Sequence, residues 1–169
     1  MADDPRCRTL VERVLGHSTA DGCVVVGSEH TETNLRWAAN NLTTNGQMAS
    51  RSVTVISILD EAAGPSAGVV TRSVTSADEV IDLVAASEQA ARRAGPADDA
   101  APLVEPYDTD DDWSADPART SVAVFERFAD GLGAAFAEVS RRDRLLFGFA
   151  EHALTSTFVG VLDRPTSAV

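Results

Sequence analysis

Residues 20–46 read ADGCVVVGSEHTETNLRWAANNLTTNG, and this stretch decides the fold class. Residues 22–30 open with a run of β-branched side chains, which is typical of a buried strand. In residues 31–41 apolar and polar side chains alternate with period two, which predicts a half-buried strand. The Asn-Gly pair within residues 43–46 favours a turn, because both residue types tolerate positive φ. The stretch therefore predicts two strands followed by a turn.

Four further segments are rich in β-branched or large apolar residues, and each predicts another strand. They are residues 51–59, 68–74, 144–152 and 154–162. The order of the first four strands and the short connections between them suggest an antiparallel meander. We therefore predict a largely antiparallel sheet of about six strands.

Three segments place apolar side chains at spacings of three and four residues, the pattern of amphipathic helices. The first begins at Asp4 and ends at Gly16. The second begins with a capping box formed by Ser76 and Glu79. The third begins near Asp116. The fold class predicted is α/β (α+β), with three helices packed against the sheet.

The whole chain, residues 1–169, is predicted to be a single domain, because its length and its 44% hydrophobic content suit one core. Residues 96–116 differ from the rest, since acidic residues crowd them and prolines interrupt them. We predict an extended acidic connector there. The Asp110–Asp112 run lacks the alternating oxygen ligands of a calcium loop, so we interpret it as solvated.

The net charge is −12, from 26 acidic and 14 basic residues. An acidic surface repels the phosphates of nucleic acids and of anionic membranes. We therefore expect neither a nucleic acid nor a membrane as a partner.

The cysteines and the amino terminus predict a cytoplasmic protein. MADDPRCRTL has early acids and no apolar core of the kind found in a signal peptide. Cys7 and Cys23 lie in no CxxC motif or Cys/His cluster. Cys23 begins an apolar run and is predicted to be buried, and a disulfide between the two cysteines stays an open alternative.

Asn34, Arg36, Asn40 and Asn41 are the candidate substrate-binding residues. Asparagine is depleted in strands, so several in one strand need a reason. One interpretation is a groove in which an extended peptide docks by β-augmentation. The other is a solvated edge strand on which Arg36 and the asparagines block unwanted pairing. Trp37 is interpreted as a core residue.

We assign no catalytic and no metal-binding residue to this chain. The only histidines are His17, His30 and His152. Adjacent strand residues point to opposite faces, so neither Glu29–His30 nor Glu151–His152 can chelate a metal by itself. A composite site from His30, His152 and a carboxylate would require two strand ends to meet.

Three stretches together resemble the opening domain of the TldD/PmbA family, the modulators of DNA gyrase. Residues 20–46 resemble the family's "Ala-Asp" strand and the alternating polar strand after it. RSVTVISIL (51–59), a loop and GVVTRSVTSADEVIDLVAASEQAARRA (68–94) resemble a strand leading into a Ser/Thr-capped helix rich in Ala and Glu. RLLFGFAEHALTSTFVG (144–160) is similar to the paired strands after the third helix, and the resemblance covers roughly residues 5–162.

The resemblance implies a curved sheet with helices packed against it. It also implies a homo- or heterodimer with a TldD/PmbA-type subunit around an enclosed cavity. The family's activity is zinc-dependent cleavage of peptides that enter in extended form, including leader peptides in microcin-type maturation.

In the family, zinc sits on a His-Glu-x-x-x-His helix with a later Cys, in the second half of a longer chain. This sequence has no such motif. The resemblance therefore implies an amino-terminal, substrate-channelling and assembly domain of a zinc metallopeptidase, inactive alone and without a cofactor of its own. Zinc is expected in a carboxyl-terminal part outside this chain. The alternative is a non-enzymatic protein-interaction domain or an inactive partner subunit, and whether the chain is a fragment or a stand-alone domain stays open.

Overall fold

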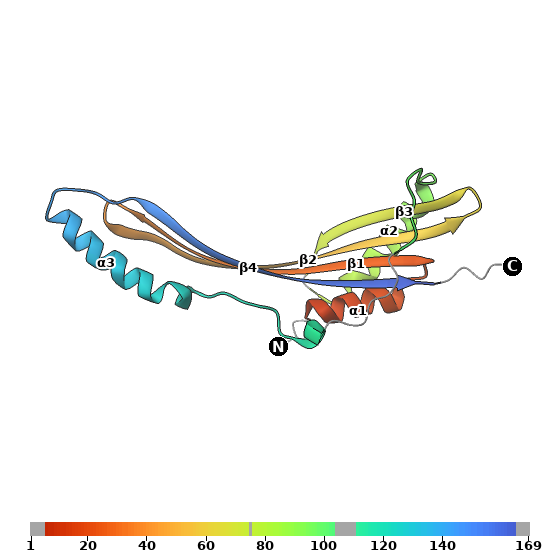
Figure 1. Cartoon of the computed structure of the whole chain (residues 1–169), viewed down its shortest axis with the longest axis horizontal. Coiled ribbons are helices and arrows are strands. Elements are labelled where there is room, and N and C mark those ends of the chain that lie inside the picture. Colours follow the sequence, from red (N-terminus) through yellow and green to blue (C-terminus); the bar gives the residue numbers. More distant parts are fainter. Residues whose placement is uncertain (1–5, 75, 104–110, 165–169) are drawn as a thin grey trace. The chain divides into compact units, whose positions relative to one another are not determined.

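The computed structural model describes residues 6–74, 76–103 and 111–164. These residues contain three α-helices, two short 3-10 helices and four strands (Figure 1). In chain order they are α1 (Cys7–His17), β1 (Gly22–Ala38), β2 (Asn41–Glu61), β3 (Gly64–Ser73), α2 (Glu79–Arg93), η1 (Asp111–Ser114), η2 (Val122–Phe125), α3 (Glu126–Ser140) and β4 (Gly148–Asp163). The α/β class and the three helices are confirmed.

The four strands form one antiparallel sheet in the order β3-β2-β1-β4. The β2–β3 register runs from Ser52↔Ser73 to Glu61↔Gly64. The predicted number of about six strands was wrong, because residues 22–30 and 31–41 fall within β1 up to Ala38, and 144–152 and 154–162 meet within β4. The polar residues at the expected boundaries lie inside continuous strands: Glu29 is buried and bonded to Cys7, and His30 lies against Thr155.

The turn between β1 and β2 is at Ala39–Asn40, and the turn predicted at residues 43–46 was wrong, since they lie within β2. Ala39 and Asn40 have φ of 50° and 62°. Two consecutive positive φ values are the signature of a type I′ hairpin turn, which matches the twist of antiparallel strands. Asparagine is well suited to this conformation and alanine is not.

The chain divides into two compact units. Unit 1 comprises Met1–Glu29, Arg51–Asp116 and Thr157–Val169, and unit 2 comprises His30–Ser50 and Pro117–Ser156. β1, β2 and β4 each contribute residues to both units. The units are described separately below.

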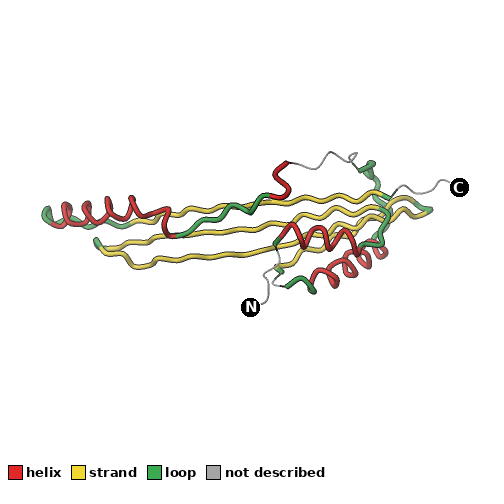
Figure 2. The backbone as a smooth tube through the Cα atoms, turned by 90° about the horizontal axis from the view of Figure 1, so that it is seen from below, coloured by secondary structure: helices red, strands yellow, loops and turns green. Residues whose placement is uncertain are grey.

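In unit 1, α1 and α2 cover one face of the sheet, and they lie together in front of the strands in Figure 2. Leu10 of α1 and Leu83 of α2 pack with Val25, Val53 and Val55, and all five side chains are 0% exposed. Each such side chain contributes about 1.5–3 kcal/mol through its removal from water. The strand residues between them face the other side, because side chains alternate along a strand.

α2 approaches β3 most closely at Gly68. A Cβ on Gly68 would overlap the backbone oxygen of Ser87 and the backbone nitrogen of Ala91. Ser57 and Ser87 extend this contact, because their hydroxyl groups are hydrogen bonded at 2.7 Å in the core. The absent side chain at Gly68 lets helix backbone and strand backbone approach.

Two buried glutamates accept hydrogen bonds at the start of helix α1 and just beyond its end. Glu29 Oε1 accepts the backbone N–H of Cys7 at 2.7 Å, and Arg51 Nε lies 3.6 Å from the same oxygen. Glu88 of α2 accepts the backbone N–H of Thr19 at 2.7 Å and its hydroxyl at 2.9 Å. Glu29 thus satisfies an N–H of the first turn, which has no partner within the helix, and Glu88 accepts two bonds from Thr19, just beyond the end of α1.

The helix boundaries differ from the predicted ones. α1 continues through Gly16 to His17, while the predicted start at Asp4 lies outside the described residues. The capping box was wrong, because Asp78 is the residue before α2 and Ser76 Oγ donates to the Glu79 side chain at 3.1 Å instead of capping the helix.

The third helix begins later than predicted. α3 begins at Glu126, after the short helix η2, and not near Asp116. In unit 2 its Phe128 packs against Trp37 with ring centroids 5.8 Å apart, so α3 covers the face of β1 that bears Trp37.

The acidic connector is only partly described, because residues 104–110 lie outside the described residues. Asp111–Ser114 forms η1 within unit 1. Trp113 there packs edge-on against Phe158, with centroids 5.9 Å apart, and donates to Glu12 Oε1 at 3.0 Å. In the described part of the chain, no helix is long and apolar enough to cross a membrane.

Candidate functional site

Side chains of β1 alternate between a covered face and an open face in unit 2. Thr31, Thr33 and Leu35 are 8%, 0% and 3% exposed. Asn34 is half-buried and Arg36 is exposed on the opposite face. β1 lies between β2 and β4, so the interpretation of this strand as a solvated edge was wrong. A central strand has no unpaired backbone edge, so Asn34 and Arg36 can offer an incoming peptide only their side chains.

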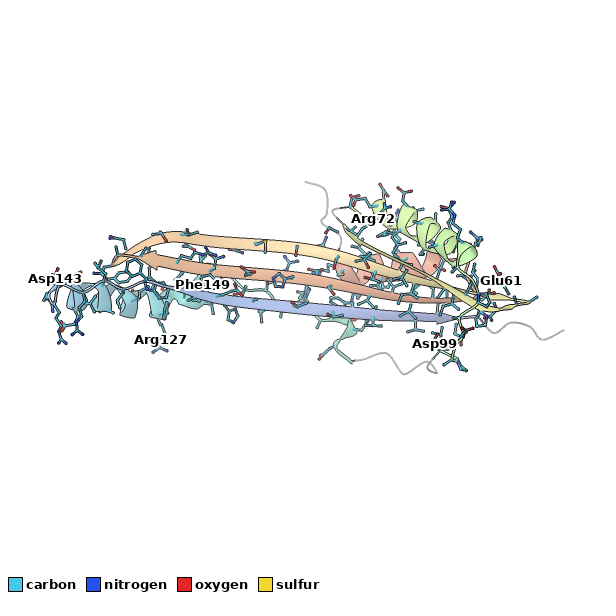
Figure 3. All side chains as sticks on the ribbon, turned by 90° about the horizontal axis from the view of Figure 1, so that it is seen from above. Glu61, Arg72, Asp99, Arg127, Asp143 and Phe149 are labelled. Atoms are coloured by element: carbon cyan, nitrogen blue, oxygen red, sulfur yellow. The ribbon has the colours of Figure 1, made fainter. Side chains whose placement is uncertain are left out.

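Arg36 lies over an aromatic ring. Its guanidinium carbon is 5.1 Å from the ring centroid of Phe149, which is 49% exposed. Figure 3 shows the place of Phe149 on the sheet. Thr43 Oγ1 donates to the Arg36 carbonyl at 3.2 Å. The cation–π contact, worth about 0.5–1 kcal/mol at an exposed site, favours an Arg36 side chain directed over Phe149.

The side chain of Asn40 makes its hydrogen bonds within unit 2. Its Nδ2 donates to Ser140 Oγ and to the Arg144 carbonyl, both at 2.9 Å, and its Oδ1 accepts the N–H of Leu146 at 2.7 Å. These bonds tie the β1–β2 turn to the segment that follows α3. Asn41 differs, because it is exposed and its amide donates only to the neighbouring Ala39 carbonyl at 2.9 Å.

β2 has an unpaired outer edge in unit 2. Its pairing with β3 ends at Ser52, and one more bond joins the Val74 N–H to the Arg51 carbonyl at 3.1 Å. In the part of the chain that the structure describes, no strand lies on the outer side of residues 41–50. All of these residues are exposed except Gly46, which is half-buried.

The sequence of this edge, NLTTNGQMAS, carries no charge and no proline. Proteins commonly protect edge strands with charged side chains or proline. Residues 41–50 have neither, in a chain of which 24% is charged. We define these ten residues as the β2 edge. Sequence reasoning missed it because Asn45–Gly46 was interpreted as a turn, and the uncharged run was the available signal.

Asn34 reaches the β2 edge at Gly46. A Cβ on Gly46 would lie 3.2 Å from Asn34 Oδ1 and 3.3 Å from Nδ2. Asn34 Nδ2 donates to Glu32 Oε1 at 3.3 Å, and Thr33 Oγ1 donates to the Gly46 carbonyl at 3.1 Å. The missing side chain at Gly46 therefore brings the amide of a central-strand residue next to the edge. Of the four candidate residues, Asn34 and Asn41 adjoin or belong to the edge.

The histidines of unit 2 bind hydroxyl groups. His30 Nδ1 lies 3.0 Å from Thr155 Oγ1, and His152 Nδ1 lies 2.8 Å from Thr120 Oγ1. No three His, Cys, Asp or Glu side chains gather as metal ligands in the described parts of the chain. A zinc site needs three or four converging ligands, so these residues do not fit one.

Both cysteines are free and buried in unit 1. Burial, with a smaller contribution from the negative charge of Glu29, raises the pKa of Cys7 to about 11. Burial also raises the pKa of Cys23. Thiols with raised pKa values are poor nucleophiles near neutral pH, so neither suits covalent catalysis.

A cleft of about 480 Å³ lies in unit 1, where β1 begins and β2 and β4 end. Asp21 Oδ2, in its lining, accepts the backbone N–H of Asp60 at 2.8 Å. The Arg164 guanidinium donates to the Ser18 carbonyl at 2.8 Å and to the Ala20 carbonyl at 3.2 Å. These polar groups hold the strand ends together.

Of the comparisons with known proteins, the one with solved structures supports the fold. No protein-family model matches the sequence, and no curated protein matches it. The structure is similar to TldE from Thermococcus kodakarensis, with a TM-score of 0.58 and 11% identity over 95% of this chain and 40% of TldE. It is also similar to a candidate modulator of DNA gyrase from Bacteroides thetaiotaomicron, with a TM-score of 0.57 and 11% identity over 92% of this chain and 35% of that protein. The chain thus spans well under half the length of either protein, and over that length it has the TldD/PmbA-family fold.

Proposed function

We propose that this chain is the substrate-channelling and assembly domain of a TldD/PmbA-like zinc metallopeptidase, and that an extended peptide pairs with the β2 edge. The fold supports the family part of the proposal. The unpaired, uncharged backbone of residues 41–50 supports the peptide part, and it is the observation on which the proposal depends. In such an enzyme the chain would pair with a TldD/PmbA-type subunit, as a homo- or heterodimer.

The backbone of the β2 edge is suited to strand addition. The Arg51 carbonyl points outward, because it accepts the N–H of Val74 beyond the end of β3. Peptide groups alternate sides along a strand, so the N–H and C=O groups of Gln47 and Ala49 also point outward. A peptide added there would extend the sheet of unit 2 through main-chain hydrogen bonds that do not depend on its sequence.

Cleavage would belong to another part of the enzyme. The described residues hold no cluster of zinc ligands, and the sequence has no His-Glu-x-x-x-His. Zinc bound elsewhere would supply an activated water for hydrolysis. We therefore assign peptide binding, and not hydrolysis, to the residues of this chain. The free thiols of Cys7 and Cys23 are compatible with a reducing compartment, and we place this function in the cytoplasm.

Binding to a labelled peptide tests the proposal. The probe is a capped, fluorescein-labelled ten-residue peptide of Ser, Thr and Val, and fluorescence anisotropy measures its binding to the full chain. Ala49→Pro removes one outward N–H and should abolish binding, since proline donates no hydrogen bond. Ala49→Thr keeps that N–H and should bind like the wild type.

Three results would overturn the proposal. One is a wild-type chain that binds no peptide. Another is an Ala49→Pro variant that binds as well as Ala49→Thr. The third is a dimer in size-exclusion chromatography that Ala49→Pro dissociates and that peptide cannot disrupt, because a second copy would then occupy the edge. Separately, one tightly bound zinc per chain in elemental analysis would contradict the assignment of zinc to another part.

A further inference from the structure

The β2 edge lacks a side chain at its middle, at Gly46, and the Asn34 amide lies over this position, which we call the gap. This inference rests on the proposed binding of peptide along that edge. Gly46 has no side chain, and its neighbours Asn45 and Gln47 are both exposed. The Asn34 amide lies at 3.2 to 3.3 Å from the position that a Gly46 Cβ would occupy. The Asn34 amide therefore fills the space that a side chain at residue 46 would take, and a peptide side chain opposite Gly46 would lie next to that amide.

The groups around the gap favour an uncharged partner. Glu32 and Arg36 flank Asn34 at two residues on either side of it, on the same face of β1. Their charges have opposite sign, so an acidic or a basic side chain at the gap would gain from one neighbour and lose from the other. The charges of Glu32 and Arg36 therefore favour neither an acidic nor a basic peptide side chain next to Asn34.

The hydrogen-bonding groups favour a carboxamide. Asn34 offers an acceptor in Oδ1 and a donor in Nδ2, and among the described residues Nδ2 donates to Glu32 Oε1 at 3.3 Å. A second carboxamide matches both groups, because it also carries one acceptor and a donor pair. Neighbouring strands lie about 4.8 Å apart, so the side chain must extend over that distance to meet the amide above Gly46. Glutamine meets this requirement better than asparagine, because its stem has one more methylene group.

The geometry points to a specificity subsite: the position opposite Gly46 accepts one glutamine side chain of the bound peptide, which pairs with the Asn34 amide that lies over Gly46. Asn34 would act through its side chain, whereas the outward backbone groups of residues 47 and 49 would act on any sequence. The predicted substrate class is extended peptide with a glutamine near the centre of the bound segment.

A set of matched peptides tests this subsite. The Ser/Thr/Val peptide described above serves as the host, with Gln, Asn, Glu, Lys or Ala at one central position. The strand can slide along the edge, so a single glutamine can reach the gap without a fixed register. The glutamine peptide should bind the wild-type chain about tenfold more tightly than the alanine peptide, the equivalent of one well-made hydrogen-bonded pair.

Variants of the chain separate this subsite from general binding. Asn34→Ala removes the amide, and Gly46→Ala places a methyl group in the gap. Each should remove the tenfold advantage of glutamine while the alanine peptide still binds. Gln47→Ala, on the same edge, should leave the advantage unchanged. Circular dichroism and thermal unfolding establish that each variant is folded.

The outcomes distinguish the subsite from the proposed function. Equal binding of all five peptides by the folded wild-type chain would overturn the subsite and leave the edge as a sequence-independent binding surface. Preference for Lys or Glu would overturn the choice of a carboxamide. An advantage for glutamine that survives both Asn34→Ala and Gly46→Ala would place the selectivity elsewhere. Failure of every peptide to bind would overturn the proposed function, and the subsite with it.

Discussion

The carboxylate of Glu29 on β1 accepts the backbone N–H of Cys7, the first residue of α1, at 2.7 Å. A strand side chain thus caps a helix to which it is not adjacent in sequence. Glu29 is 6% exposed, and Arg51 Nε lies 3.6 Å from the same carboxylate oxygen. Helix α1 and the sheet of unit 1 are therefore joined by charge as well as by apolar packing.

Replacing Glu29 should destabilise unit 1. Glu29→Ala removes the helix cap and one partner of a buried ion pair, and we expect a loss of about 3 kcal/mol in the free energy of unfolding. Glu29→Gln keeps an acceptor oxygen and should lose about 1 kcal/mol. Urea denaturation followed by circular dichroism measures both values.

The control is the exposed ion pair of Arg13 and Asp78, at 3.0 Å, in which the Asp78 side chain is 90% exposed. Asp78→Ala should cost less than about 1 kcal/mol. Equal losses for Glu29→Ala and Asp78→Ala would show that the Glu29 cap contributes little.

Asn40→Ala should loosen the turn of unit 2. The change removes three hydrogen bonds, to Ser140, Arg144 and Leu146, and it places alanine at a φ of 62°. We expect about 2–3 kcal/mol of local destabilisation and faster hydrogen exchange at the Leu146 amide. Asn41→Ala, which removes a single exposed bond, should leave that exchange rate unchanged. Unaltered exchange in Asn40→Ala would contradict the assignment of Asn40 to structure.

Gly68→Ala should separate α2 from β3. The added methyl group would overlap the backbone of Ser87 and Ala91, which cannot move as a flexible side chain can. We expect a loss of roughly 3 kcal/mol, at the upper end of overpacking effects. Gly131→Ala in α3 is the matched change, because nothing lies within 4 Å of its added methyl group, and it should stabilise by about 1 kcal/mol. Thermal unfolding that ranks the two variants in the opposite order would refute the close approach at Gly68.

The free energy of unfolding should fall at alkaline pH because the Cys7 thiol ionises. Its pKa is raised from the ordinary 9.0 to about 11, so the folded chain keeps the proton over a range in which the unfolded chain loses it. The stabilisation is complete below pH 9 and is lost as pH rises through about 11, by on the order of 2–3 kcal/mol. The free energy of unfolding of the wild type, measured under reducing conditions, should fall more steeply over this range than that of Cys7→Ala. Parallel slopes for the two proteins would exclude a raised pKa at Cys7.

The helices and the class of the fold could be predicted from the sequence because their signals are local. The apolar stripe of α2 follows from side-chain periodicity alone, and Val80, Leu83 and Val84 are buried as that periodicity predicts. The number of strands depends less on local sequence signals. Polar residues such as Glu29 and His30 looked like strand ends, yet Glu29 is bonded inside unit 1 and His30 faces Thr155 on the open side.

The turn shows why local chemistry can mislead. Asn45–Gly46 has the best turn composition in the region, but the chain turns at Ala39–Asn40. The side chain of Asn40 makes its bonds to residues about one hundred positions later in the sequence, near Arg144 and Leu146. No short window of sequence contains that information. Because the turn lies at residues 39–40 and not at 43–46, Gly46 belongs to a strand, and the β2 edge was not recognised from the sequence.

The division of strands between the two units constrains how this chain can be shortened or extended. Unit 2 is made of two separate insertions into unit 1, residues His30–Ser50 and Pro117–Ser156. Removing only one of them would leave β1, β2 and β4 with unmatched lengths. An engineered or natural variant with longer or shorter strands in unit 2 must therefore lengthen or shorten both insertions together. The number of residues added to or removed from each strand must be even if the alternation of side chains is to be kept.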